Sequence, residues 1–139
     1  MIYIAYPSQC PEEVKQVFEG LSEDFEITTP KEREKFSRYE FVKKSRELIK
    51  ESGVFIAEAS YPSSGVELEA AWAHENKISI TLFVKRGKDY PNALKNFYLK
   101  LINYVNPKDL REKLVEFLNN ELPLESKKDY EKYTEEDGK

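Results

Sequence analysis

The chain has 139 residues, a formal net charge of −4 and a single cysteine, Cys10. A chain of this length fits one domain with a core of its own. The acidic balance argues against a nucleic-acid polymer as the main partner, because a phosphate backbone requires a concentrated basic face. One cysteine excludes an internal disulfide, which suits a cytoplasmic protein.

The sequence contains no motif typical of a membrane-spanning segment, a metal site or a cofactor site. No apolar run approaches the roughly 18 residues of a membrane-spanning helix, and the opening MIYIAYPSQC has no basic region of the kind that starts a secretory signal. There is no cysteine/histidine cluster, no dinucleotide-binding fingerprint and no phosphate-loop lysine motif. We therefore expect no membrane partner, no metal and no cofactor.

Short apolar runs alternate with segments of helical period. Strands are expected over residues 2–6, 25–29, 54–58, 78–84 and 102–105. Helices are expected over residues 11–21, 39–52, 66–75, 90–101 and 106–120. The segment 30–38 is charged, has no clear period and reads as a connection. The inner face of the helix over 39–52 is expected to carry Phe41, Val42, Leu48 and Ile49.

This alternation predicts an α/β fold with right-handed crossovers. We expect an open, parallel five-stranded sheet, flavodoxin-like or Rossmann-like, with helices on both faces and strand order 2-1-3-4-5. Residues 1–120 would form this single domain. The acidic tail over residues 121–139 has little periodicity and is expected to be mobile or to serve as a docking arm.

The run VFIAEASYPSSGVELEAAWA, residues 54–73, places several carboxylates and small polar residues around one turn. Glu58 ends an apolar strand, and Ser63 and Gly65 directly precede a helix. Ligands of open α/β sheets bind where strands end, and a helix start offers free N–H groups to a phosphate. The same residues also fit an ordinary N-cap turn, which is the alternative.

Glu69 lies about one turn into that helix, on the side of Val66, Ala70 and Ala73. Small apolar neighbours leave room for a ligand beside a carboxylate that faces the sheet. A capping-turn acid that reaches solvent is the alternative.

The run IAEASYPSSGVELEAAWA resembles the signature of the nucleoside 2-deoxyribosyltransferase family. It is most similar to the branch of 2′-deoxynucleoside 5′-monophosphate N-glycosidases, in which Ala-Glu and then Pro-Ser-x-Gly-Val-x-x-Glu recur. The resemblance implies that Glu69 is the nucleophile on C1′ of the sugar, as in a retaining glycosidase. It further implies that Ser63 and Gly65 hold a 5′-phosphate and that Glu58 shapes the same pocket.

The resemblance also implies a homodimer or larger assembly. The segment around Asn92 matches the region that helps to close the site of a neighbouring subunit. The substrate would be a nucleoside or nucleoside 5′-monophosphate, and the reaction either hydrolysis or transfer to a second base.

Two positions depart from the family pattern. The Asp that assists the leaving base falls on Ser45, and serine is not a general acid near neutral pH. The small-residue loop after the first strand is replaced by Tyr6, Pro7 and Ser8, where Tyr6 either fills the pocket or stacks on a base. Two hypotheses follow: an N-glycosidase or deoxyribosyltransferase with Glu69 as nucleophile, or a nucleotide-binding module that kept the pocket and lost the reaction.

Overall fold

The structure of the protein is a computed structural model, which describes residues 1–98 and 100–121. Its centre is a parallel five-stranded sheet in the order β2-β1-β3-β4-β5, which confirms the predicted topology. The strands are β1 (Ile2–Ala5), β2 (Ile27–Thr28), β3 (Val54–Glu58), β4 (Ser79–Lys85) and β5 (Lys100–Tyr104).

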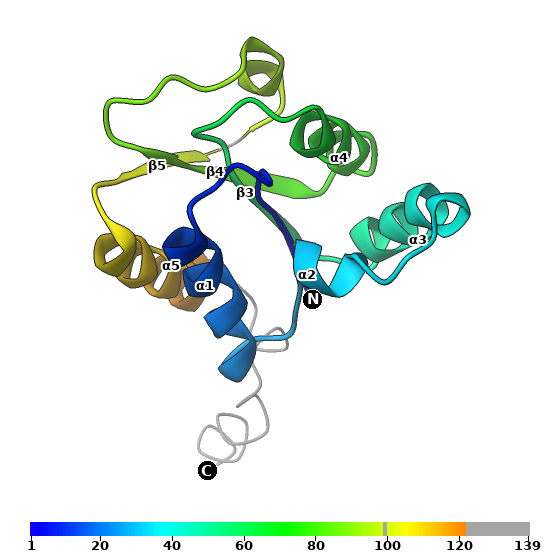
Figure 1. Cartoon of the computed structure of the whole chain (residues 1–139), viewed down its shortest axis with the longest axis horizontal. Coiled ribbons are helices and arrows are strands. Elements are labelled where there is room, and N and C mark those ends of the chain that lie inside the picture. The colour runs from blue at the N-terminus through cyan, green and yellow to red at the C-terminus, as the bar shows by residue number, and fades with distance from the viewer. Residues whose placement is uncertain (99, 122–139) are drawn as a thin grey trace.

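Helices cover both faces of the sheet, with α1 and α5 on one side and α3 and α4 on the other (Figure 1). The α-helices are α1 (Glu12–Gly20), α2 (Pro30–Arg33), α3 (Arg38–Lys50), α4 (Ser64–Glu75) and α5 (Pro107–Glu121). Two 3₁₀ helices, η1 (Leu21–Glu23) and η2 (Asn92–Asn96), complete the described elements. Within the described residues, no helix is both long and apolar enough to cross a membrane.

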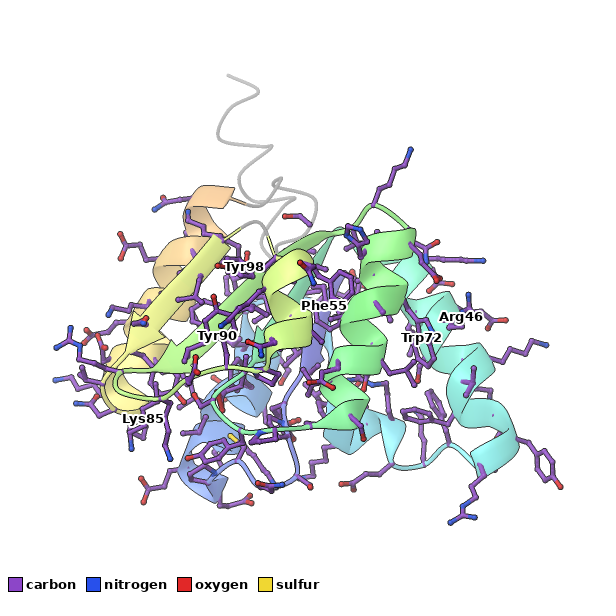
Figure 2. All side chains as sticks on the ribbon, turned by 90° about the horizontal axis from the view of Figure 1, so that it is seen from above. Arg46, Phe55, Trp72, Lys85, Tyr90 and Tyr98 are labelled. Atoms are coloured by element: carbon purple, nitrogen blue, oxygen red, sulfur yellow. The ribbon has the colours of Figure 1, made fainter. Side chains whose placement is uncertain are left out.

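The pleat of each strand divides its side chains between two cores. Ile2 and Ile4 of β1 pack toward α1 and α5, whereas Tyr3 packs toward α3 and α4. Both sets are buried, as expected of a parallel sheet covered on each face. In Figure 2 Phe55 of β3 lies between α4 and η2, and its ring stacks on Tyr3 at a centroid distance of 5.4 Å.

Local sequence fixes where the helices begin. Ser37 and Glu40 form a reciprocal capping box at the start of α3, with N–O distances of 3.0 and 3.2 Å. Ser63 caps α4 by accepting a hydrogen bond from the Val66 amide at 3.2 Å. Asn106 caps α5 in the same way, because its Oδ1 accepts from the Asp109 amide at 2.8 Å.

Three expectations about elements are wrong. Residues 30–33 form the helix α2, because Thr29 caps it and Pro30 supplies its first turn. The helix expected over 90–101 is replaced by the short η2 and by β5, which starts at Lys100. Val42 does not join the inner face of α3 and is 46% exposed, whereas Ser45 and Ile49 are buried. The expected acidic tail lies, from residue 122 on, outside the described residues.

The strand order creates a switch point between β1 and β3. The chain leaves β1 toward α1 on one face and leaves β3 toward α4 on the other. Open α/β sheets bind ligands in the crevice that forms beyond the carboxyl ends of the strands at such a point. A ligand site is therefore expected at the carboxyl ends of β1 and β3.

Candidate active site

A cavity of about 360 Å³ opens beside this switch point, within the range of about 300–1,000 Å³ typical of small-molecule sites. Tyr6 contributes to its wall from the loop after β1, and Val66 and Glu69 contribute from α4. The other described lining residues come from α2, the start of α3 and the connection between them, namely Pro30, Arg33, Glu34, Phe36, Ser37, Arg38 and Phe41. We call this space the Glu69 cavity.

The Glu69 carboxylate is held through one of its two oxygens. The Tyr3 hydroxyl donates a hydrogen bond to Oε2 at 2.5 Å, and Arg33 Nη2 lies 3.4 Å from the same oxygen. Oε1 makes no hydrogen bond within the described part of the chain. Glu69 is only 8% exposed, yet it lines the cavity. The carboxylate is thus fixed on one side and open to a ligand on the other.

Arg33 is itself locked in place, and it is 3% exposed. Nη2 donates to the main-chain oxygen of Ile4 at 2.5 Å, and Nη1 donates to Thr28 Oγ1 at 3.2 Å. The guanidinium carbon lies 3.9 Å from the centroid of the Tyr3 ring, in cation–π geometry. A buried guanidinium with these partners supplies a fixed positive charge beside Glu69.

Burial and the nearby charges shift the pKa values of Glu69 and Tyr3. Burial raises the pKa of the Glu69 carboxyl above its usual value, while the charge of Arg33 and the Tyr3 hydrogen bond oppose that rise. Burial, followed by the charge of Glu69, raises the pKa of the Tyr3 phenol. Tyr3 therefore remains a hydrogen-bond donor at neutral pH. Arg33 and Tyr3 together favour the ionised form of the Glu69 carboxyl against the effect of burial.

Ser45 lies on α3 near the Tyr3 hydroxyl and does not line the Glu69 cavity. Its side chain is fully buried on α3, as expected for the inner face. Its hydroxyl is close enough to Tyr3 to lower the pKa of that phenol slightly, but Ser45 Oγ makes no hydrogen bond of standard geometry. Ser45 therefore contacts the support of Glu69 and not the open side of its carboxylate.

Tyr6 forms part of the cavity wall. Its hydroxyl donates to Glu19 Oε2 at 2.7 Å, and its ring packs near Phe18 at a centroid distance of 6.1 Å. These contacts anchor the side chain in the wall of the cavity that Glu69 also lines, so Tyr6 does not fill that cavity. Tyr6, Pro30 and Glu34 also border a second cavity of about 460 Å³, which we call the outer cavity.

Of the remaining predicted site residues, some line a cavity and others do not. Ser8 lines the outer cavity. Ser63 and Gly65 lie at the start of α4, one turn before Glu69, but neither lines the Glu69 cavity. Asn92 is exposed at the start of η2 and lines neither cavity.

Glu58 is placed on the opposite face of the sheet from Glu69. It follows Val54 and Ile56 in the alternation of β3, and these face α1 and α5. Oε1 accepts a hydrogen bond from the Ser60 amide at 2.5 Å, and Oε2 is buried without a hydrogen bond in the described structure. Burial raises the pKa of the Glu58 carboxyl. Glu58 therefore supports the loop that leads to α4 and does not reach the Glu69 cavity.

Sequence reasoning missed Tyr3, Arg33 and Glu34. Tyr3 was hidden in an apolar strand, and the two others were hidden in the segment read as a charged connection. The pair Thr29-Pro30 is a helix-start signal that could have revealed α2. Nothing local could have paired Arg33 with Glu69, because 36 positions separate them.

The cavity offers a buried carboxylate, a fixed cation and aromatic walls. The rings of Tyr6, Phe36 and Phe41 line it and could stack on a planar heterocycle. Within residues 1–98 and 100–121, no group of three or more His, Cys, Asp or Glu side chains is arranged to hold a metal ion. The chemistry that this geometry can support is nucleophilic attack by a carboxylate.

Comparisons with known proteins agree with the fold. No protein-family model matches the sequence, and no curated protein matches it. Among solved structures, the chain is similar to the CMP N-glycosidase BcmB of Clostridium botulinum, with a TM-score of 0.60 and 22% sequence identity. The match covers 83% of this chain and 99% of that one. At this identity the likeness shows a shared fold.

Proposed function

We propose that this protein cleaves the N-glycosidic bond of a nucleoside or nucleoside 5′-monophosphate, with Glu69 as the nucleophile. The observation that carries the proposal is the asymmetry of the Glu69 carboxylate. Oε2 is held by Tyr3 and Arg33, while Oε1 has no partner within the described residues and the side chain lines a cavity. Glu58 also has one oxygen without a hydrogen bond, but it lines neither the Glu69 cavity nor the outer cavity. The unpartnered oxygen of Glu69 together with the cavity that this residue lines is therefore what points to a ligand.

The reaction would proceed in two steps. Glu69 Oε1 attacks C1′ of the sugar through an oxocarbenium-like transition state, and the electron pair of the C1′–N bond leaves with the base. Water then attacks C1′ of the resulting ester and returns the carboxylate. Transfer of the sugar to a second base would replace the attack by water.

Three features support this substrate class. The walls formed by Tyr6, Phe36 and Phe41 suit a planar base. The start of α4, with Ser63 and Gly65, suits a 5′-phosphate through its free N–H groups and partial positive charge. The structural neighbour is, by its name, a CMP N-glycosidase.

We also propose that the protein is a homodimer. Large hydrophobic side chains are exposed on the two helices that border the cavity, Tyr39 and Val42 on α3 and Leu68 on α4. A second copy seated there would cover them and would bring a further segment, the one around Asn92, toward the site. Size-exclusion chromatography with light scattering measures the mass of the assembly, and a monomer at micromolar concentration would contradict this part of the proposal.

Release of free base tests the reaction. A panel of ribo- and deoxyribonucleosides and their 5′-monophosphates is incubated with the protein and resolved by chromatography. Glu69→Gln keeps the shape of the side chain but removes the nucleophile, so we expect base release to fall by about 10³-fold or more. Glu67→Gln is the matched control, because Glu67 lies on the same helix and lines neither cavity.

The nucleotide-binding module remains the competing function, favoured by the burial of Ser45 away from the cavity. That hypothesis predicts calorimetric binding of a nucleotide with no base release by the wild-type protein. Base release that is lost in Glu69→Gln and kept in Glu67→Gln would exclude it.

A further inference from the structure

The proposed reaction needs a group that moves protons, and Ser45 does not supply it. The leaving base must gain a proton in the first step, and the attacking water must lose one in the second. Ser45 is fully buried behind Tyr3 and does not line the Glu69 cavity. A serine hydroxyl is also too weak an acid to serve as a general acid near neutral pH.

Among the described side chains that line the Glu69 cavity, two carry carboxyl groups, Glu69 and Glu34. Arg33 and Arg38 also line it, but a guanidinium stays protonated and cannot act as a base. Burial, followed by the Glu19 hydrogen bond, raises the pKa of the Tyr6 phenol, which makes it a poor proton donor to a leaving base. Glu34 is therefore the remaining side chain in this wall with suitable chemistry.

The position of Glu34 is fixed by its neighbours on α2. It caps the carboxyl end of α2, where its amide donates to the main-chain oxygen of Pro30 at 3.1 Å. The preceding residue, Arg33, is anchored on β1 and β2 through Ile4 and Thr28. One short helix thus places the cation beside Glu69 and an acid in the same cavity wall.

The Glu34 side chain is exposed and has room to act. It makes no hydrogen bond or ion pair within the described residues, and it borders both the Glu69 cavity and the outer cavity. Its charge also contributes to the raised pKa of Tyr6, so its carboxylate lies near the end of that ring. This places Glu34 where the two cavities meet, with access to water from the outer one.

We propose that Glu34 is the acid–base catalyst of the reaction at Glu69, an inference that rests on the function proposed above. In the first step Glu34 gives its proton to the base nitrogen as the C1′–N bond breaks and the C1′–O bond to Glu69 forms. In the second step the Glu34 carboxylate takes a proton from water as the water oxygen bonds to C1′ and the ester bond to Glu69 breaks. The cycle consumes one water and returns Glu34 protonated and Glu69 ionised.

Glu34→Gln tests this role, because it keeps the side-chain shape and removes the proton exchange. We expect kcat for base release to fall by about 10²–10⁴-fold and one limb of the pH–rate profile to disappear. Glu32→Gln is the matched control, since Glu32 lies on the same helix and lines neither cavity. Equal kcat and equal pH profiles in Glu34→Gln and the wild type would overturn the inference.

Azide separates a catalytic from a structural role. This anion attacks a glycosyl ester without giving up a proton, so it replaces Glu34 in the second step only. The test therefore uses a nucleoside whose base is a good leaving group and needs no proton from the enzyme, so that the second step limits turnover. With this substrate we expect sodium azide to restore turnover in Glu34→Gln and to yield a glycosyl azide. A slow Glu34→Gln variant that azide does not accelerate on this substrate and that forms no glycosyl azide would also overturn the inference.

The two proposals fail in different ways. A wild-type protein that releases no base from any substrate overturns the N-glycosidase function and this inference with it. Base release that requires Glu69 but is unchanged in Glu34→Gln overturns only the inference.

Discussion

Two buried glutamates lie near the carboxyl edge of the same sheet, on opposite faces. Glu58 is fully buried and Glu69 is 8% exposed, and burial raises the pKa of both. Glu69 has Arg33 and Tyr3 on one oxygen and a cavity before the other. Glu58 has the Ser60 amide on one oxygen, makes no ion pair with the described residues, and lines neither the Glu69 cavity nor the outer cavity. Burial alone therefore does not mark a catalytic carboxylate, whereas a compensating cation and access to a ligand do.

The titratable side chains near Glu58 are held in their neutral, unreactive forms. Burial and the nearby Glu58 raise the pKa of the Cys10 thiol to about 12, which makes it a poor nucleophile at neutral pH. Burial, followed by the charge of Glu58, also raises the pKa of Tyr104. We interpret this face as core that supports the loop before α4, and the following variants test the contrast between the two carboxylates.

Removal of the compensating cation should have the largest effect on stability. Arg33→Met leaves the Glu69 carboxylate buried beside an apolar side chain, so we expect a loss of about 3–5 kcal/mol in the free energy of unfolding at neutral pH. The pKa of Glu69 should rise further, because the charge that opposes the effect of burial is gone. The acid limb of the kcat/KM profile for base release should then move to higher pH.

A matched control exists for this variant. Arg46 and Glu75 form an ion pair with the same N–O distance of 3.4 Å, but both side chains are largely exposed. In Figure 2 Arg46 lies on α3 opposite Trp72 of α4, at the surface between the two helices. Arg46→Met should cost about 1 kcal/mol or less. Urea unfolding measures both variants, and equal costs would contradict the role assigned to Arg33.

Glu58→Gln should have a smaller effect, seen in the pH dependence of stability. A carboxyl whose pKa is raised in the folded state binds more protons there than in the unfolded chain. Wild-type stability should therefore fall as pH rises from the ordinary carboxyl value of 4.5 toward the raised value, by up to about 1.4 kcal/mol per pH unit. Glu58→Gln should reduce this slope and leave base release within about twofold of the wild type.

Urea unfolding between pH 5 and pH 8 measures that slope. The residual slope in Glu58→Gln reports the other raised carboxyl, Glu69, which contributes with the same sign. An unchanged slope together with a large loss of activity would mean that Glu58, and not only Glu69, takes part in the reaction.

Ser45→Ala should have the smallest effect. The Ser45 hydroxyl is buried without a standard hydrogen bond and does not touch the cavity. Its removal should change stability by less than about 1 kcal/mol and activity by less than about twofold. A tenfold loss of base release in this variant would show that Ser45 has a part in the reaction that the geometry does not give it.

Local patterns predicted most of the fold. Apolar runs and helical periods fixed the order of strands and helices. Asn106 is the capping residue at the expected place, and Ser63 caps α4 as in the N-cap alternative. The helix α2 was missed because four residues are too short to show a hydrophobic period. The segment 90–101 was misread because residues of the edge strand β5 are only partly buried, which blurs their alternation.

The candidate site was predicted only in part. The side of α4 that carries Glu69 followed from its spacing to Val66, Ala70 and Ala73, all of which are buried. The face of Glu58 could not be read from β3, since a strand covered on both sides is apolar throughout. The partners of Glu69 come from β1 and α2, 66 and 36 positions away, so only the tertiary fold brings them together.

Capture of the covalent intermediate tests directly whether Glu69 is the nucleophile. A 2′-fluoro nucleotide slows the second step, so the sugar should remain attached to the enzyme as an ester. Glu58 and Glu69 lie in one tryptic peptide, residues 51–77, and fragmentation of that peptide by mass spectrometry assigns the modified residue. We expect a sugar on Glu69 and none on the peptide of Glu69→Gln. A sugar on Glu58, or steady base release with no adduct on either glutamate, would contradict the assignment of Glu69 as the nucleophile.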